Sequence, residues 1–390
     1  MKRSWMAVAA LAVLVGCGGG GGGGVNPPPD PGYISKLEPA VELHVDQIVR
    51  DYQFSDNIPG LSVGVVAGGK VVLVKGYGAA EISSGTPVDA NTYFEIGSCT
   101  KSFTSFGVLR MVDDPTLIRK QGIASLNLDE RVKTYLVGSP NVQIPPDWDN
   151  ITVRELLSMT SGIPDGSSNT SIWQIVIATA AGKPLEFDPS TGYCYSNPGY
   201  MILGELIQQL SGMSYADYMA TYVFTPLGLD KTFIHTPNNT PLGLATGYEW
   251  TGAAWDTPAP RSPLSSFSSG AVITTAGDLA KFLLALEQKK ILKAATYTTM
   301  FKAVELPLRS SEWGLGWNCI DDDTIKIYRK DGGLPGYSAQ MSIYKTEGVC
   351  VALCTNETGV PTAKIAADIV AAIKKVDTVP NPAPPIQDCD

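Results

Sequence analysis

Residues 94–106 read Phe94-Glu95-Ile96-Gly97-Ser98-Cys99-Thr100-Lys101-Ser102-Phe103-Thr104-Ser105-Phe106. A short extended segment here passes into a helix, and the helix begins with the pattern Ser-x-x-Lys, from Ser98 to Lys101. Residues three apart share one face of a helix, so the Ser98 hydroxyl and the Lys101 amine can meet. A serine hydroxyl becomes a good nucleophile when a neighbouring base removes its proton, and a neutral lysine can be that base.

Lys101 must be neutral near pH 7 for this chemistry. The pKa of free lysine is about 10.4, so the site has to lower it by about 3 units, which corresponds to about 4 kcal/mol. Burial beside Phe103 and Phe106 is one source of such a shift. A second Ser-x-x-Lys, from Ser342 to Lys345, lies in an alternating run typical of a strand, where positions three apart face opposite sides.

Composition limits the possible functions. The chain has 390 residues, 44% of them hydrophobic, which is enough for a sizeable core in one large domain or two lobes. Only 17% of the residues are charged and the net charge is -9, so no nucleic-acid partner is expected. There are two histidines, His44 and His235, and no His-Glu-x-x-His or Cys-x-x-Cys pattern, so neither a metal nor another cofactor is expected.

The N-terminus has the pattern of an exported protein. Residues 1–16 predict a signal peptide, because two basic residues precede an apolar run that is too short to span a bilayer. Leu14 to Cys17 resembles the bacterial lipobox, which implies cleavage before Cys17 and its lipidation; the alternative is an ordinary signal peptide that contains a cysteine. Gly18 after that cysteine resembles lipoproteins of the outer membrane, so we expect a lipid-anchored protein of the bacterial cell envelope that faces the periplasm.

Residues 17–32 form a Gly- and Pro-rich linker after the predicted anchor. About fifteen such residues reach at most about 50 Å, so the linker would let a folded domain stand off the membrane. We expect that domain to span residues 33–378, followed by a Pro-rich tail at 379–390.

Periodicity within the domain predicts strands near both ends of the chain. An amphipathic helix at 37–52 precedes strands at 61–66 and 70–76, which a tight turn at Gly68-Gly69 joins. Strands at 314–320, 324–330, 337–344 and 349–355 precede a closing helix at 363–376. Between them, at about 115–262, short helical runs, among them 153–159, 200–210 and 215–222, alternate with Pro, Gly and Asn clusters. The predicted fold class is therefore α+β: one antiparallel sheet built from both ends, flanked by terminal helices, with an inserted all-α lobe.

Two further motifs accompany the Ser98 helix. Tyr195-Ser196-Asn197 is the only Tyr-x-Asn in the chain, and Lys330-Asp331-Gly332 is followed by Gly333. With these three ordered motifs, the sequence resembles the serine β-lactamase and penicillin-binding superfamily from about residue 58 to 376. It is most similar to the group with class C β-lactamases, DD-carboxypeptidases, D-aminopeptidases and family VIII carboxylesterases. The segments 151–164 and 199–205 match helical-lobe signatures of that group.

The resemblance implies a role for each motif residue. Ser98 would be the acylated nucleophile, Lys101 would take part in its deprotonation, and Tyr195 would be a second general base. Asn197 would hydrogen-bond the substrate amide or Lys101. Lys330 would raise the local positive potential and hold Tyr195 as a phenolate or near it. The backbone N–H groups of Ser98 and Gly333 would form the oxyanion hole, each contributing about 3 kcal/mol.

Asp331 departs from the pattern of the family, which usually has a small hydroxyl residue there that helps to bind a substrate carboxylate. An ionised Asp331 would repel such a carboxylate by about 1–4 kcal/mol. We therefore expect ester or amide cleavage more than efficient β-lactam hydrolysis. The alternatives are a β-lactamase or DD-carboxypeptidase acting on D-Ala-D-Ala peptides, a slowly deacylating penicillin-binding receptor or peptidoglycan-binding protein, and an interaction protein on an inactive scaffold.

Two expectations concern the surroundings of the site. Cys99 and Cys194 each adjoin a proposed catalytic residue, so a disulfide between them is one possibility, whereas Cys350 and Cys354 lie too far apart along one strand to pair. The helical lobe and the loop from Trp250 to Ser268 are expected to line the substrate pocket.

Overall fold

The structure is a computed structural model that describes residues 33–168, 171–307, 312–375 and 379. The predicted signal peptide, the lipidation site at Cys17 and the linker lie outside the described residues, as does the predicted tail beyond residue 379. These segments, the membrane anchor and the envelope location therefore stay predictions. Within the described ranges, no helix has the length and apolar character needed to cross a membrane.

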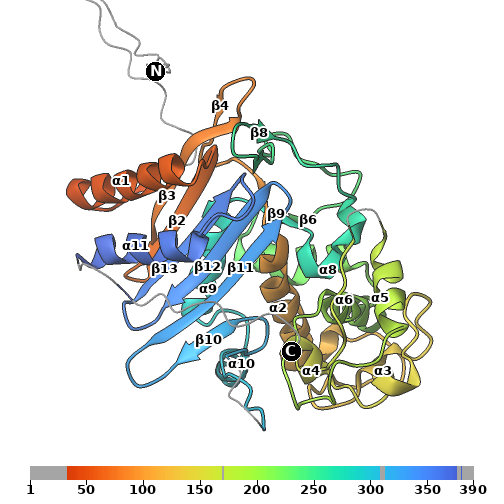
Figure 1. Cartoon of the computed structure of the whole chain (residues 1–390). Helices are drawn as coiled ribbons and strands as arrows, with labels where there is room; N and C mark the ends of the chain where they lie inside the picture. Colours follow the sequence, from red (N-terminus) through yellow and green to blue (C-terminus); the bar gives the residue numbers. More distant parts are fainter. Residues whose placement is uncertain (1–32, 169–170, 308–311, 376–378, 380–390) are drawn as a thin grey trace, which may run out of the picture.

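A central antiparallel sheet is assembled from both ends of the chain (Figure 1). Its strands are β1 (Ile34–Ser35), β2 (Gly60–Ala67), β3 (Lys70–Glu81), β4 (Thr86–Pro87), β10 (Asn318–Asp321), β11 (Lys326–Leu334), β12 (Tyr337–Tyr344) and β13 (Val349–Thr355). The order is β1-β3-β2-β13-β12-β11-β10, and β4 pairs with β3 beside this path. Strand β2 lies next to β13, with Val65 opposite Val351, which confirms the predicted sheet.

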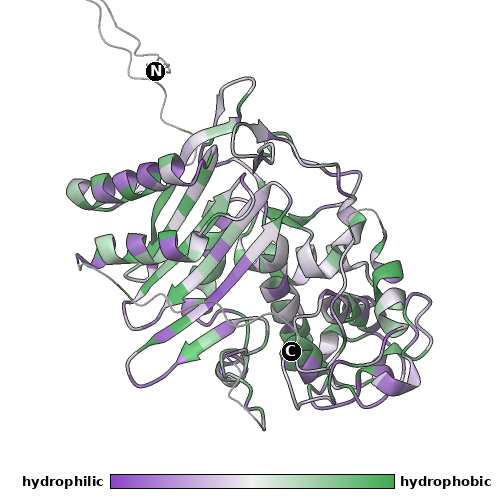
Figure 2. Ribbon diagram, in the orientation of Figure 1, coloured by the Kyte–Doolittle hydropathy of each residue, from purple (hydrophilic) through white to green (hydrophobic). Residues whose placement is uncertain are grey.

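The terminal helices α1 (Pro39–Ser55) and α11 (Thr362–Lys374) cover one face of this sheet (Figure 1). They bury Val49 and Ile369 in one apolar cluster with Val65 of β2. Figure 2 shows apolar residues along the strands that face these helices and polar residues on the outer sides of the helices. Burial on both faces explains why the sequences of β2 and β13 are almost continuously apolar.

The opposite face is covered by α2 (Thr100–Asp113) and α9 (Ala276–Glu287). Helix α9 approaches β2 so closely that a Cβ atom at Gly64 would lie 2.4 Å from the carbonyl oxygen of Ala276. Helix α2 is buried around nearly its whole circumference although it is rich in Ser and Thr. Its hydroxyls are satisfied internally: Ser102 Oγ donates to the Gly316 carbonyl at 2.8 Å.

The helical lobe lies beside the sheet, with α2 between them (Figure 1). Its helices are α3 (Val132–Leu136), α4 (Val153–Leu157), α5 (Trp173–Ala181), α6 (Asn197–Ser211) and α7 (Tyr215–Met219). The sequence predicted a helix from Tyr200, but α6 begins at Asn197 because Ser196 caps it, its Oγ accepting the Gly199 N–H at 3.1 Å. The cap places Asn197 in the first helical turn and Tyr195 just before it.

Smaller elements join the lobe to the sheet. They are β5 (Phe94–Glu95), β6 (Phe233–Ile234), β7 (Glu249–Trp250), β8 (Trp255–Asp256), α8 (Phe267–Gly270), β9 (Val272–Thr274) and α10 (Ala294–Met300). Strands β5, β9 and β6 form a three-stranded sheet in that order. This small sheet fixes β5 immediately before Ser98 and fixes β9 immediately after α8.

The strand predicted at 314–320 is wrong over its first half, because β10 begins only at Asn318. Gly316 has a positive φ of 84°, which does not fit a strand. The carbonyls of Leu315 and Gly316 instead accept hydrogen bonds from Ser105 and Ser102 of α2. The segment therefore satisfies the buried hydroxyls of α2 rather than extending the sheet.

Candidate active site

The structure brings Ser98, Lys101, Tyr195, Asn197 and Lys330 together. Ser98 lies in a 3-10 turn, Gly97–Cys99, that leads into α2. Lys101 Nζ is 3.0 Å from Ser98 Oγ, and the Tyr195 hydroxyl also contacts Ser98 Oγ. Lys330, on β11, places its amine 5.7 Å from the centre of the Tyr195 ring.

The Lys101 side chain is fully buried in this site. Burial first, and the positive charge of Lys330 second, hold the pKa of Lys101 well below its usual range. The rings next to its amine belong to Tyr195 and Tyr200, with centroids at 4.6 and 5.7 Å. Phe103 and Phe106, the predicted neighbours of this amine, instead pack against Phe282.

The contacts of Lys101 Nζ fit a neutral amine. Asn197 Oδ1 lies at 2.7 Å and the Ser269 carbonyl oxygen at 2.8 Å, and both can only accept. A neutral amine has two N–H groups, which these two oxygens occupy. Its lone pair remains for the proton of the Ser98 hydroxyl, so Lys101 is placed as a base toward Ser98.

Tyr195 has the opposite proton state. Burial of its phenol, its largest influence, raises its pKa well above 10, and the nearby Asp331 and Asp165 raise it further. The phenolate expected from the proximity of Lys330 is therefore a wrong prediction, because the loss of hydration outweighs that charge. A protonated Tyr195 can donate its proton but cannot be the first base.

Two glycines let strand β11 approach the start of α2. A Cβ at Gly332 would lie 2.0 Å from the Ile96 carbonyl oxygen and 3.0 Å from Ser98 N. Gly97 has a φ of 47°, and a Cβ there would lie 2.9 Å from Gly333 N. The backbone N–H groups of Ser98 and Gly333 thus come from two adjacent backbones, as an oxyanion hole requires.

Asp331 carries a negative charge next to these glycines of β11. Lys330, the main influence, lowers the pKa of Asp331, and Lys330 Nζ lies 3.4 Å from Asp331 Oδ1. The Asp331 side chain is 53% exposed. It shares a face of β11 with Gly333, two residues on, where a Cβ would meet open space.

A cavity of about 230 Å³ opens next to Ser98. The loop after β8 contributes Arg261, Ser265 and Ser266 to its wall, in agreement with the expectation for residues 250–268. The Arg261 guanidinium is 2.6 Å from Glu95 Oε2, and His235 Nδ1 is 2.8 Å from Glu95 Oε1. Sequence reasoning missed this buried cluster, because its three members lie far apart in the chain.

Sequence reasoning also missed Asp165. Its Oδ1 accepts the backbone N–H of Asn197 at 2.7 Å and the side-chain Nδ2–H of the same residue at 3.2 Å. One signal was present, since Asp165 directly follows the lobe signature that ends at Pro164.

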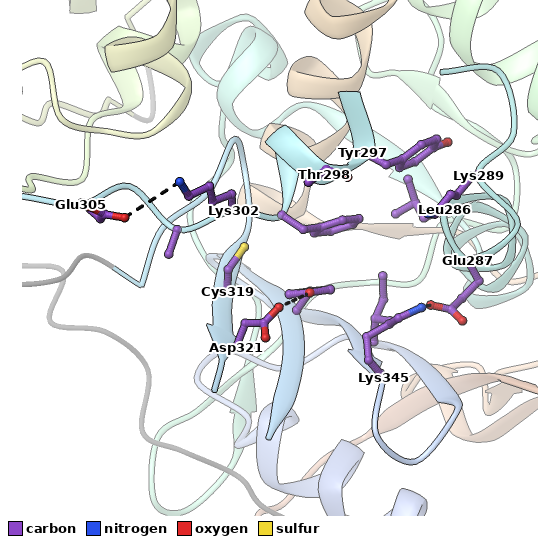
Figure 3. A pocket seen from close by; sticks show the side chains of 14 residues that line it. Leu286, Glu287, Lys289, Tyr297, Thr298, Lys302, Glu305, Cys319, Asp321 and Lys345 are labelled. Carbon is purple, nitrogen blue, oxygen red and sulfur yellow. Dashed lines mark hydrogen bonds and ion pairs between the residues drawn. The ribbon is translucent and has the colours of Figure 1, made fainter. Parts of the chain in front are cut away.

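A larger cavity, of about 560 Å³, lies away from these residues (Figure 3). It is lined by Phe301 and Tyr328, whose rings stack at 4.4 Å, and its edge carries the Lys345–Glu287 ion pair. None of the motif residues lines it, so cavity size does not locate the chemistry in this protein.

Two other candidate nucleophiles are excluded. Ser62 lies in a Gly-x-Ser-x-Gly pattern at residues 60–64, but it is buried within β2 and contacts the Lys75 carbonyl. Cys99 is buried, and burial raises the pKa of its thiol to about 12, so it stays protonated.

Cys99 is also a free thiol, which makes the disulfide with Cys194 a wrong prediction. Cys350 and Cys354 are both free, so they do not pair with each other, as predicted.

Comparison with known proteins adds to this geometry. Residues 45–374 match the family model described as Beta-lactamase. Penicillin-binding protein 4* of Bacillus subtilis (strain 168) is 28% identical over 303 residues, which cover 71% of this chain and 63% of that protein. Unguisins hydrolase ungD' of Aspergillus campestris is 27% identical over 355 residues, covering 83% of this chain and 64% of the hydrolase. The chain therefore spans about three fifths of the length of these curated relatives.

Solved structures share the fold. The penicillin-binding protein homologue from Pyrococcus abyssi aligns with a TM-score of 0.71 at 23% identity, over 84% of this chain and 76% of that chain. The D-amino acid amidase from Ochrobactrum anthropi SV3, complexed with L-phenylalanine amide, aligns with a TM-score of 0.69 at 23% identity, over 86% and 99%.

Proposed function

This chain belongs to the beta-lactamase family, and on that premise we propose that it is a serine hydrolase that forms an acyl-enzyme at Ser98 and cleaves an ester or an amide. The main support for the proposal is that Ser98 Oγ contacts both Lys101 and Tyr195. The buried amine of Lys101 at 3.0 Å can take its proton, and the protonated phenol of Tyr195 can donate a proton to the leaving group.

Acylation begins with Lys101. The neutral amine removes the proton of Ser98, and Ser98 Oγ attacks the substrate carbonyl. Negative charge then develops on the carbonyl oxygen, where the backbone N–H groups of Ser98 and Gly333 receive it.

Collapse of the tetrahedral intermediate uses Tyr195. Its phenol donates a proton to the departing oxygen or nitrogen, and the protonated Lys101 restores the proton of Tyr195. Lys101 is neutral again at the end of this step. It can then accept a proton from the water that attacks the acyl-enzyme, so one base serves both half-reactions.

Asp331 is the basis for the proposed substrate class. Its ionised, half-exposed carboxylate lies on the same face of β11 as Gly333, which lines the cavity beside Ser98. A substrate carboxylate would be repelled there, so neutral esters, neutral amides and substrates with a cationic group are favoured.

One observation favours a second candidate, a β-lactamase or a DD-carboxypeptidase for D-Ala-D-Ala peptides. Arg261 lines the cavity beside Ser98, and a guanidinium is a good partner for a substrate carboxylate. The charge of Arg261 is already balanced by Glu95, so we rank this candidate second.

The experiment follows p-nitrophenyl butyrate and a chromogenic cephalosporin in parallel, with Ser98→Ala as the control. Ester turnover that disappears in Ser98→Ala, with little cephalosporin turnover, supports the proposal. Fast cephalosporin hydrolysis identifies the second candidate instead. Covalent penicillin binding without turnover identifies a slowly deacylating receptor.

A further inference from the structure

Asp165 holds Asn197 at two points. Its Oδ1 accepts the Asn197 backbone N–H at 2.7 Å and the side-chain Nδ2–H at 3.2 Å, and Oδ2 is 3.5 Å from Nδ2. Asp165 lies in the segment after α4, and Asn197 is the first residue of α6. The contact therefore joins two parts of the helical lobe at the rim of the Ser98 cavity.

A side-chain amide has one donating end and one accepting end, and the two are nearly equal in shape. A carboxylate can only accept hydrogen bonds. Asp165 therefore fixes which way the Asn197 amide points. Its Nδ2 must face Asp165, and its Oδ1 must face Lys101 Nζ, 2.7 Å away.

This orientation decides how Lys101 uses its lone pair. With Oδ1 toward it, Lys101 donates one N–H to Asn197 and the other to the Ser269 carbonyl, and its lone pair is left for Ser98. With the amide reversed, Nδ2 would donate to that lone pair and compete with the Ser98 proton. A buried amine that spends its lone pair on an amide is no base for the nucleophile.

We propose that Asp165 is a positioning residue that keeps Lys101 available as the base by fixing the orientation of the Asn197 amide. This inference rests on the proposed function of Ser98 and Lys101. Asp165 touches no reacting atom and acts only through Asn197 and through its own charge.

The charge provides a second, independent effect. Burial first and Lys330 second lower the pKa of Lys101, while Asp165, Asp331 and the thiol of Cys99 raise it. The other groups facing the amine are Ser98, the Ser269 carbonyl and the rings of Tyr195 and Tyr200. Because the neutral amine is the active form, the rate rises with pH through the pKa of Lys101. Loss of the Asp165 charge lowers that pKa, so the acidic limb of the rate profile should move to lower pH.

The first experiment is a double-mutant cycle with Asp165→Ala and Asn197→Ala. The readout is the second-order rate of labelling by an alkyl fluorophosphonate, in which Ser98 Oγ displaces fluoride, with the site identified by peptide mass. On the alkaline plateau, we expect Asp165→Ala to slow labelling about 10²-fold in the wild-type background, as for a displaced catalytic group. In the Asn197→Ala background the same change should cost about threefold or less. Equal losses in both backgrounds would overturn the positioning role.

The second experiment measures the same rate from pH 4.5 to 9 for Asp165→Asn and for Asp188→Asn. Asp188 is an exposed carboxylate of the same lobe, so its variant controls for the loss of one surface charge. We expect the acidic limb to move to lower pH in Asp165→Asn and to stay in place in Asp188→Asn. The inference is contradicted if the acidic limb lies at the same pH in wild type and Asp165→Asn. It is also contradicted if both variants shift the limb equally.

Failure of the inference and failure of the proposed function are distinguishable. A wild-type protein that is not labelled at Ser98 refutes the proposed function, and the role of Asp165 falls with it. If Ser98 is labelled but the losses of labelling rate in Asp165→Ala and Asn197→Ala are additive, only the role of Asp165 is refuted. Thermal unfolding of each variant separates a loss of fold from a loss of rate.

Discussion

The amine of Lys101 lies 3.0 Å from the hydroxyl oxygen of Ser98, at the end of a side chain with no exposed surface. Burial disfavours the charged amine, and two carbonyl-type oxygens accept the only two N–H groups that a neutral amine has. The remaining lone pair faces the nucleophile. In the proposed mechanism, the site thus prepares its base before any substrate binds.

Tyr195→Phe tests the role of the phenol as a proton donor. We expect the loss to depend on the leaving group, because p-nitrophenolate departs without protonation and an amine does not. Turnover of an anilide or amide should fall about 10²- to 10⁴-fold, and turnover of a p-nitrophenyl ester should fall much less. Steady-state kcat/KM values for both substrates give the result; equal losses would show that Tyr195 acts mainly as a base for the nucleophile.

Gly332→Ala tests the close approach on which the proposed oxyanion hole depends. The added Cβ would lie 2.0 Å from the Ile96 carbonyl oxygen, so β11 must move away from Ser98. We expect kcat to fall about 10²-fold or more, the usual effect of losing one oxyanion donor.

Gly333→Ala is the matched control for this change, because a Cβ there meets nothing within 4 Å. It should cost less than Gly332→Ala in kcat at similar thermal stability. The reverse order would indicate that the spacing between β11 and α2 does not limit the reaction.

Asp331→Thr tests the proposed discrimination against carboxylates. Removal of a half-exposed negative charge should raise kcat/KM for a cephalosporin about tenfold. It should change kcat/KM for a neutral ester by no more than a few-fold. The ratio of the two kcat/KM values is the measurement. A ratio unchanged by the substitution would mean that Asp331 does not select the substrate.

Arg261→Gln tests the buried cluster behind the cavity. Although burial by itself would raise the pKa of Glu95, its partners His235 and Arg261 hold that pKa below its usual range. We expect the variant to lose about 3 kcal/mol of unfolding free energy at pH 7, because a buried carboxylate loses its guanidinium partner. Urea denaturation measures this loss.

The stability that Arg261 gives through Glu95 has a defined pH dependence. A carboxyl group with a lowered folded-state pKa stabilises the fold above its ordinary pKa of about 4.3, and this contribution disappears as the pH falls through the folded value. The difference in unfolding free energy between wild type and Arg261→Gln should therefore become smaller below about pH 4. Lys345→Gln, which breaks the more exposed pair with Glu287, is the control and should cost less than about 1 kcal/mol. A similar loss in both variants would contradict a special role for the buried cluster.

Local spacing was enough to predict the parts of the site that lie close in sequence. Ser98 and Lys101 meet because they are three apart at the start of a helix. The alternation of the strands, together with the glycine turn at Gly68-Gly69, predicted the sheet that is built from both ends of the chain. The cap at Ser196 was not recognised, so α6 was predicted three residues too short.

The sequence has no comparable pattern that would predict contacts between distant segments. Asp165 meets Asn197 across 32 positions, and Arg261 meets Glu95 across 166. The proton state of Tyr195 was mispredicted for a related reason. The nearby positive charge of Lys330 follows from the motif, but the degree of burial that outweighs it depends on how the whole lobe packs.

The central claim is that Ser98 becomes acylated with Lys101 as its base. Intact-mass spectrometry of the protein, quenched during turnover of p-nitrophenyl butyrate and followed by peptide mapping, tests it most directly. We expect a butyryl adduct on Ser98 that is absent in Ser98→Ala. The adduct should form at least about 10²-fold more slowly in Lys101→Arg, because arginine keeps its charge and cannot take the proton. An adduct on another residue, or turnover that survives in Ser98→Ala, would show that Ser98 is not the nucleophile.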